Sequence, residues 1–134
     1  MATRSSRTKG PGTPRRAVGT SRRPAPSALP AIDKARLRGL IEEAIVDAYG
    51  ESEQRVGFLT MMQDHLEIPF ETEVLGVPVQ VIGIDLDDTE EIVATCKRDA
   101  RVQRIQVLDL PLPRPPPGGF EWIEAYRLFR RGDW

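Results

Sequence analysis

The chain has 134 residues, which leaves room for one folded domain of ordinary size. Its single cysteine, Cys96, excludes an intramolecular disulfide and with it a secreted disulfide-bonded scaffold. No apolar run approaches the roughly 18 residues needed to span a bilayer. The N-terminus lacks the apolar stretch of a secretory signal, so we expect a cytoplasmic protein without membrane contact.

Charge is distributed unevenly along the chain. The whole sequence holds 19 Lys and Arg against 20 Asp and Glu. Residues 1–31 carry seven basic side chains and no acid, so residues 32–134 carry 12 bases and 20 acids, a net charge of −8. Such a division concerns partners and ions rather than the fold.

The first 31 residues predict a disordered basic tail. Arg, Ser, Thr, Gly and Pro dominate them, and such a segment buries too little surface to offset the entropy of ordering. The tail is interpreted as a plain solvated extension, a weak polyanion contact, a targeting segment, or a segment that folds back onto its own acidic domain. Residues 32–134 form the predicted acidic domain.

Hydrophobic periodicity predicts two helices at the start of this domain. Apolar residues over 37–48 follow the spacing of an amphipathic helix, with Asp33 as N-cap and Gly50 as terminator. A second helix is expected over about 52–66, in which Gly57 would let a neighbour approach closely. The short connection predicts an antiparallel helical hairpin.

After residue 69 the hydrophobic period changes to two. This pattern predicts short strands over residues 70–75, 79–86, 92–98 and 102–108. Their short connections predict an antiparallel meander or a small barrel. A polyproline II stretch over 111–119 and a helix over 121–131 follow. The fold class is therefore α+β, with an N-terminal helical hairpin packed on a small antiparallel four-stranded sheet or barrel and a C-terminal helix.

Acidic residues crowd the middle of the chain. From Glu42 to Glu91 the sequence holds 14 of the 20 acids, and Arg55 is the one Lys or Arg among them. Folding brings these charges together, which costs stability unless a cation lies among them. Oxygen ligands suit Ca²⁺, whereas a single His and a single Cys argue against a soft metal. The composition therefore favours Ca²⁺.

Two carboxylate pairs on the predicted helices are candidate ligands. Glu43 and Asp47 lie four residues apart on one predicted helix face and repel one another. Asp64 and Glu67 lie three apart near the end of the second helix, which the hairpin returns toward the start of the first. For either pair alone, a solvated helix face is the simpler interpretation.

A third candidate is the turn that holds Asp85, Asp87 and Asp88. It begins like a calcium loop but is no EF-hand, because its sixth position is Glu90 rather than glycine and predicted strands flank it. A charged hairpin turn and a weak calcium site are equally consistent with it.

The residue types of a catalytic site are scarce. His65 has no nucleophile at triad spacing and is interpreted as a surface or capping residue. Cys96 is interpreted as a small core residue, and Trp122 and Tyr126 as core aromatics at helical spacing. We therefore expect no enzyme, and a hydrolase that uses a carboxylate pair ranks last among the functions considered.

Several motifs resemble those of a known family. Residues 41–49 (IEEAIVDAY), Gly57-Phe58, residues 63–70 (QDHLEIPF) and residues 122–126 (WIEAY) are similar to the small calcium-binding proteins of the cyanobacterial CcbP type. The resemblance implies a non-EF-hand protein that buffers or senses Ca²⁺, with Asp64 as the leading ligand. Gln63 stands where that family usually has a glutamate. The alternative is an adaptor that recruits a protein partner through the proline-rich segment or the Arg-rich tail.

Overall fold

The structure, a computed structural model, describes residues 30–134. The chain divides into a first unit, residues 1–31, and a second unit, residues 32–134. The basic tail is predicted to be disordered and to contact a polyanion. Except for residues 30 and 31, this tail lies outside the described residues. Both stay predictions. The second unit has the α+β fold class predicted from the sequence.

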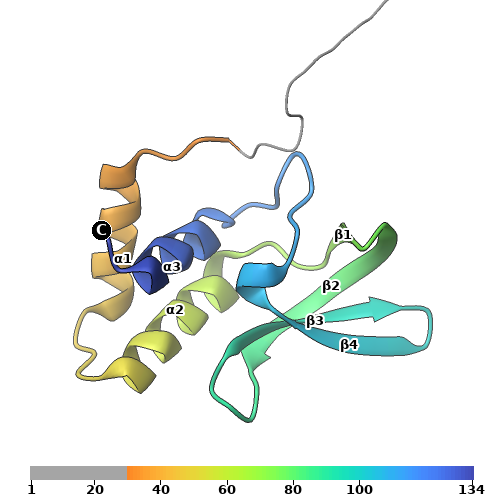
Figure 1. The fold of residues 1–134 in the computed structure, drawn as a ribbon, viewed down its shortest axis with the longest axis horizontal. Helices are drawn as coiled ribbons and strands as arrows, with labels where there is room; N and C mark the ends of the chain where they lie inside the picture. Colours follow the sequence, from red (N-terminus) through yellow and green to blue (C-terminus); the bar gives the residue numbers. More distant parts are fainter. Residues whose placement is uncertain (1–29) are drawn as a thin grey trace, which may run out of the picture. The chain divides into compact units, whose positions relative to one another are not determined.

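Three helices lie on one side of the second unit (Figure 1). α1 (Lys34–Ile45) begins after Asp33, whose carboxylate accepts a hydrogen bond from the N–H of Ala35 at 3.4 Å, as predicted for the N-cap. α2 (Glu51–His65) follows, and α3 (Glu121–Arg131) contacts both earlier helices. None of the helices within residues 30–134 is long and apolar enough to cross a membrane.

α1 and α2 approach each other closely at Gly57. A Cβ atom at this position would lie 2.1 Å from the carbonyl oxygen of Ala44, a distance that excludes any side chain. The predicted role of Gly57 is confirmed. Glycine is required here because the backbone of one helix occupies the place of the missing side chain.

The four strands form one antiparallel sheet in the order β1-β2-β3-β4. They are β1 (Phe70–Val74), β2 (Val77–Leu86), β3 (Ile92–Arg98) and β4 (Arg101–Gln106). Each strand pairs with the next along the chain, so the predicted meander is confirmed. The sheet is open, with β1 and β4 at its edges, and the barrel alternative is therefore wrong.

The core lies between the helices and one face of the sheet. α2 is the helix that contacts the sheet, at β2. Phe58 and Met62 of α2 are fully buried, and the ring centroid of Phe58 lies 5.1 Å from that of Tyr126. Trp122, Tyr126 and Cys96 are all buried, which confirms their predicted place in the core.

α1 ends earlier than predicted, at Ile45 rather than near Gly50. Val46 leaves the helical conformation with ψ 133°, and Asp47 adopts φ +62°. Aspartate tolerates this left-handed region better than most residues with a side chain. The prediction that Glu43 and Asp47 share a helix face is therefore wrong, because Asp47 lies outside the helix.

The last strand also ends earlier than predicted. The residues after Gln106 form a 3₁₀ turn, η2 (Val107–Asp109). Val107 and Leu110 are both buried, with 1% and 3% of their surface exposed. Residues three apart share one side of a 3₁₀ turn but lie on opposite faces of a strand. Burial of both side chains therefore favours the turn.

The proline-rich stretch after η2 contains no helix or strand and is attached to the fold at both ends. The hydroxyl of Thr72 on β1 donates a hydrogen bond to the carbonyl oxygen of Pro111 at 2.6 Å. At the other end, Gly118 exchanges two hydrogen bonds with Glu67. The stretch therefore connects the edge of the sheet with the end of α2.

Candidate metal site

The carboxylates predicted as metal ligands lie in three places on the fold. Glu43 in the last turn of α1 lies near Asp47 of the α1–α2 connection, Asp64 and Glu67 lie at the end of α2, and Asp85 near the end of β2 precedes Asp87 and Asp88 of the β2–β3 turn. Within residues 30–134, no group of three or more His, Cys, Asp or Glu side chains is close enough to hold a metal ion. Ca²⁺ also takes main-chain carbonyl oxygens and water as ligands, so the surroundings of each carboxylate matter as well.

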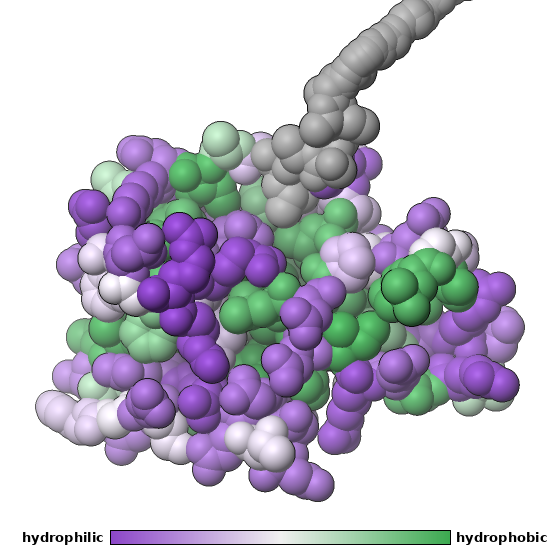
Figure 2. Space-filling view, in the orientation of Figure 1, coloured by the Kyte–Doolittle hydropathy of each residue, from purple (hydrophilic) through white to green (hydrophobic). Residues whose placement is uncertain are grey.

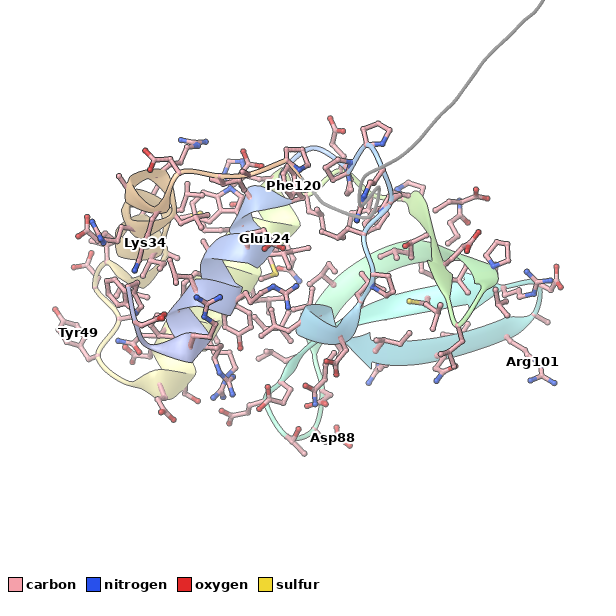
Figure 3. All side chains as sticks on the ribbon, turned by 45° about the horizontal axis from the view of Figure 1, so that its top comes forward. Lys34, Tyr49, Asp88, Arg101, Phe120 and Glu124 are labelled. Atoms are coloured by element: carbon pink, nitrogen blue, oxygen red, sulfur yellow. The ribbon has the colours of Figure 1, made fainter. Side chains whose placement is uncertain are left out.

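The α1–α2 connection presents Asp47 beside the start of α2. Asp47 and Glu53 both line a shallow depression of about 520 Å³. The carboxylate of Glu53 accepts a hydrogen bond from the N–H of Tyr49 at 2.8 Å, and Tyr49 itself extends outward from the connection (Figure 3). Glu53 lies in the first turn of α2, where free N–H groups give the helix end a partial positive charge. An acid is stabilised there without a cation.

The end of α2 has the opposite polarity. Asp64 is exposed in the last turn, where free carbonyl groups give the helix end a partial negative charge. Glu67 follows the helix, and its carboxylate accepts a hydrogen bond from the N–H of Gly118 at 3.1 Å. The N–H of Glu67 donates in turn to the carbonyl oxygen of Gly118 at 2.8 Å. Two carboxylates thus lie next to a carbonyl-rich helix end.

α3 links the end of α2 with the start of α1. The exposed ring of His65, the predicted surface histidine, stacks on Trp122 with 5.4 Å between ring centroids. Arg36 of α1 forms an ion pair with Glu121 at 3.5 Å. The end of the second helix and the start of the first therefore share the first turn of α3 as a neighbour.

Gln63 has a structural function next to Asp64. Its amide Nε2 donates a hydrogen bond to the carbonyl oxygen of Ile84 on β2 at 2.8 Å. A glutamate, which the resemblance leads us to expect at this position, has no donor for this contact when ionised. Glutamine therefore replaces a negative charge by a fixed connection between α2 and the sheet. From the sequence, only the loss of charge was evident.

Asp87 organises the β2–β3 turn. Its Oδ1 accepts hydrogen bonds from the hydroxyl of Thr89 at 2.7 Å, the N–H of Thr89 at 2.8 Å and the N–H of Glu91 at 3.0 Å. These hydrogen bonds, that of the Thr89 hydroxyl above all, hold the pKa of Asp87 below its ordinary value of 3.8. Asp85 accepts a hydrogen bond from the N–H of the next residue at 2.8 Å. Asp88 lies at the tip of the turn (Figure 3).

Two arginines compensate the charge in the second half of this turn. Glu90 forms an ion pair with Arg55 of α2 at 3.6 Å and accepts a hydrogen bond from the hydroxyl of Ser52. Glu91 forms an ion pair with Arg130 of α3 at 3.5 Å. Arg55 was evident from the sequence as a basic residue among the acids, whereas Arg130 was not, because it follows Glu91 by 39 positions. No local signal connects the two residues.

The second half of the β2–β3 turn and the end of α2 are separate places. The turn contacts α2 at Ser52, and Asp64 lies 12 residues further along the helix. At 1.5 Å per residue, that separation is about 18 Å. Asp64 and the acids that contact the start of α2 therefore do not share one ion.

Cys96 is poorly suited to bind a metal. Its side chain is 3% exposed, and burial raises the pKa of the thiol. Metal coordination requires the thiolate, which this environment disfavours. The oxygen atoms of the acidic residues are the remaining ligands that the chemistry of the fold offers.

Two solved structures are similar to this fold. The crystal structure of Anabaena CcbP matches with a TM-score of 0.61 and 20% sequence identity, covering 77% of this chain and 95% of that chain. A structure described as a calcium binding protein in the calcium-binding form matches with a TM-score of 0.59 and 22% identity, covering 75% and 93%. No curated protein matches the sequence significantly.

Three helices beside an open four-stranded meander define a small α+β domain that is not an EF-hand. The CcbP model, described as calcium binding, matches residues 38–113, more than half of the chain. The chain belongs to this family of calcium-binding proteins, and Ca²⁺ is its ion. The resemblance read from the sequence motifs is confirmed, and the matched residues include all the predicted ligands. The adaptor alternative is not favoured.

Proposed function

We propose that the protein buffers or senses Ca²⁺ and that the main binding site is the end of α2. Asp64 is the leading ligand and Glu67 the second. The position of Asp64 in the last turn of α2 carries this proposal. An acid in that turn is repelled by the helix dipole, so a bound cation relieves a cost that is present in the ion-free protein.

The acids elsewhere have less need of a cation. Glu51 and Glu53 lie in the first turn of α2, where the helix dipole favours them. Glu90 and Glu91 are paired with arginines. Asp87 accepts three hydrogen bonds. Asp64, by contrast, lies in the last turn of α2, where the helix dipole disfavours a negative charge, and this supports the end of α2 as the main site.

The donor set at the end of α2 suits Ca²⁺. Asp64 and Glu67 supply carboxylate oxygens, and the last turn of α2 supplies carbonyl oxygens. Ca²⁺ takes six to eight oxygens in flexible geometry, so water completes such a site. The bound ion supplies positive charge at a helix end that otherwise carries only negative charge.

A second, weaker site is proposed at the β2–β3 turn, with Asp85, Asp87 and Asp88 as ligands. Glu43 and Asp47 at the α1–α2 connection rank third, because they are no longer neighbours on one helix face. The protein is proposed to be cytoplasmic and to bind the ion without catalysing a reaction.

Calorimetric titration of the chelator-treated full chain with Ca²⁺ and with Mg²⁺ tests the proposal. Asp64→Asn should weaken calcium binding more than Glu51→Gln, which removes one charge from the other end of the same helix. Equal affinities in the two variants would place the main site elsewhere. Asp88→Asn then tests the β2–β3 turn by the same titration. Excess Ca²⁺ that produces neither heat nor a rise in Tm would contradict binding altogether.

A further inference from the structure

The two edge strands of the sheet, β1 and β4, have different surroundings. The proline-rich stretch lies beside β1, where Thr72 donates a hydrogen bond to Pro111. β4, at the other edge, is exposed along its length apart from the half-buried Ile105. Within residues 30–134, its outer side makes no main-chain hydrogen bond with another segment. In an edge strand every second residue directs its N–H and C=O outward. β4 therefore offers free main-chain donors and acceptors.

The hairpin that contains this edge has the opposite charge from the whole second unit. Residues 97–106 contain Lys97, Arg98, Arg101 and Arg104 and a single acid, Asp99, for a net charge of +3. Residues 32–134 together carry −8. Arg101 lies at the end of the sheet that is remote from the helices (Figure 3). A basic edge on an acidic domain attracts negatively charged partners.

An apolar groove of about 460 Å³ lies on one face of the sheet beside this edge. The strand pairing puts its lining on the same face as the buried Val81, so the groove continues the core face beyond the helices (Figure 1). Its described lining combines apolar residues with two arginines: Val74, Val77, Val79, Ile105, Arg98 and Arg101. Hydrophobic side chains are visible over the β1–β2 turn (Figure 2), where Leu75 is 97% exposed.

We propose that β4 binds an extended acidic segment of a partner protein, which adds to the sheet as a fifth strand. Main-chain hydrogen bonds to β4 provide the attachment, and cross-strand pairs provide the selectivity. Acidic residues of the partner lie opposite Arg101 and Arg104. Apolar residues of the partner lie opposite Val102 and Ile105, with one side chain over the groove.

A second copy of this chain is a poorer occupant of the same edge. In a symmetric antiparallel pair of β4 strands centred on Gln103, Arg101 faces Ile105 of the other copy and Val102 faces Arg104. Four arginines would then gather around apolar residues without an acid to compensate them. The same arginines that disfavour self-pairing favour an acidic strand.

The probe that tests this is a short fluorescent peptide with the core Val-Glu-Thr-Val-Glu, which complements residues 101–105 in antiparallel register. Its anisotropy is measured with the full chain in chelator at about 150 mM salt, where long-range charge effects are screened.

Arg101→Glu combined with Arg104→Glu should weaken binding about tenfold or more. Lys34→Glu combined with Arg38→Glu makes the same change in net charge on exposed positions of α1 and should leave binding unchanged. The basic tail is present in every variant, so its contribution cancels.

Two further probes separate strand addition from simple charge attraction. A peptide N-methylated at the alternate residues whose N–H groups face β4 lacks the main-chain donors for strand addition and should bind much more weakly than the parent peptide. A peptide with lysine in place of glutamate should also bind more weakly. Full binding by the N-methylated peptide overturns the proposal, and so does equal binding in the two double variants. If a short oligothymidylate binds more tightly than the acidic peptide, and the edge variant loses this binding, the surface binds nucleic acid instead. If the parent protein self-associates and the edge variant does not, the edge binds a second copy of the chain instead. If no probe binds, the proposal is wrong and the arginines only protect the edge from pairing.

Discussion

Asp64→Asn should raise the stability of the calcium-free protein and lower the stability that Ca²⁺ adds. In the calcium-free protein the substitution removes a negative charge from the last turn of α2. Such a charge is unfavourable there by about 0.3–1 kcal/mol. For a domain of about 100 residues, 1 kcal/mol corresponds to roughly 4–8 °C in Tm. The Tm of the variant in chelator should therefore exceed that of the parent by about 1–8 °C.

Calcium should reverse this order. The parent gains about 2.7 kcal/mol when free Ca²⁺ is a hundredfold above Kd, whereas the variant, without its leading ligand, should gain much less. Scanning calorimetry in chelator and in excess Ca²⁺ measures both effects. Glu51→Gln is the matched control, because it should lower the Tm in chelator and keep the calcium-dependent rise. A lower Tm for Asp64→Asn in chelator, or a calcium-dependent rise as large as that of the control, would refute the reasoning.

Three further substitutions test other parts of the structure, each by unfolding in chelator. Asp87→Asn should lower the free energy of unfolding at pH 7, because the lowered pKa of Asp87 means that the folded protein favours its charged form. That deficit should shrink as the pH falls below about 3.8 and vanish once the carboxyl is protonated in both states. Gly57→Ala should cost about 2 kcal/mol or more, because its Cβ would overlap a carbonyl oxygen of α1. Gln63→Glu should cost about 1–3 kcal/mol, because it removes a hydrogen-bond donor to β2.

Matched variants accompany the last two of these tests. Gly39→Ala lies in α1 with no atom within 4 Å of the new Cβ, and should stabilise by about 0.5–1 kcal/mol. A similar gain for Gly57→Ala would contradict the close approach of the helices. Gln54→Glu adds the same charge to the first turn of α2, where the helix dipole favours it by about 0.3–1 kcal/mol, so Gln63→Glu should be the less stable variant by more than this dipole effect alone. Equal stability of these two variants would show that the contact with Ile84 contributes nothing. For Asp87→Asn, a deficit that persists unchanged at low pH would contradict a charge effect.

Local patterns predicted most of the fold. The period of two gave four strands in the observed order, and the spacing of Trp122 and Tyr126 gave α3 with its bounds. The errors concern the ends of α1 and β4, where the backbone conformation of one or two residues ends the element. α1 ends where Val46 leaves the helical conformation and Asp47 adopts a left-handed one, and the chain turns at Val107 because both it and Leu110 are buried. Hydrophobic periodicity does not reveal either of these element ends.

The candidate site was less predictable than the fold. Counting acids identified the part of the chain that holds the candidate ligands, but the number of charges does not tell which acids are already compensated. Glu91 is neutralised by Arg130 of a distant helix, and Asp87 is held by hydrogen bonds within its own turn. Gln63 gains its function from a strand that lies 21 positions further on. Contacts of this kind depend on the tertiary structure, so the sequence alone does not show which acids they compensate.

The ion pairs of Glu90 and Glu91 have a consequence for the order in which the protein folds. Arg55 precedes the β2–β3 turn in the chain, so Glu90 can be neutralised as soon as α2 and the hairpin meet. Arg130 comes 39 positions after Glu91, and its charge arrives only with α3. A nascent chain that has made the sheet but not α3 therefore carries an acidic turn that is only half compensated. Docking of the last helix completes both the core, through Tyr126, and the electrostatics of the turn, so the two events should occur together.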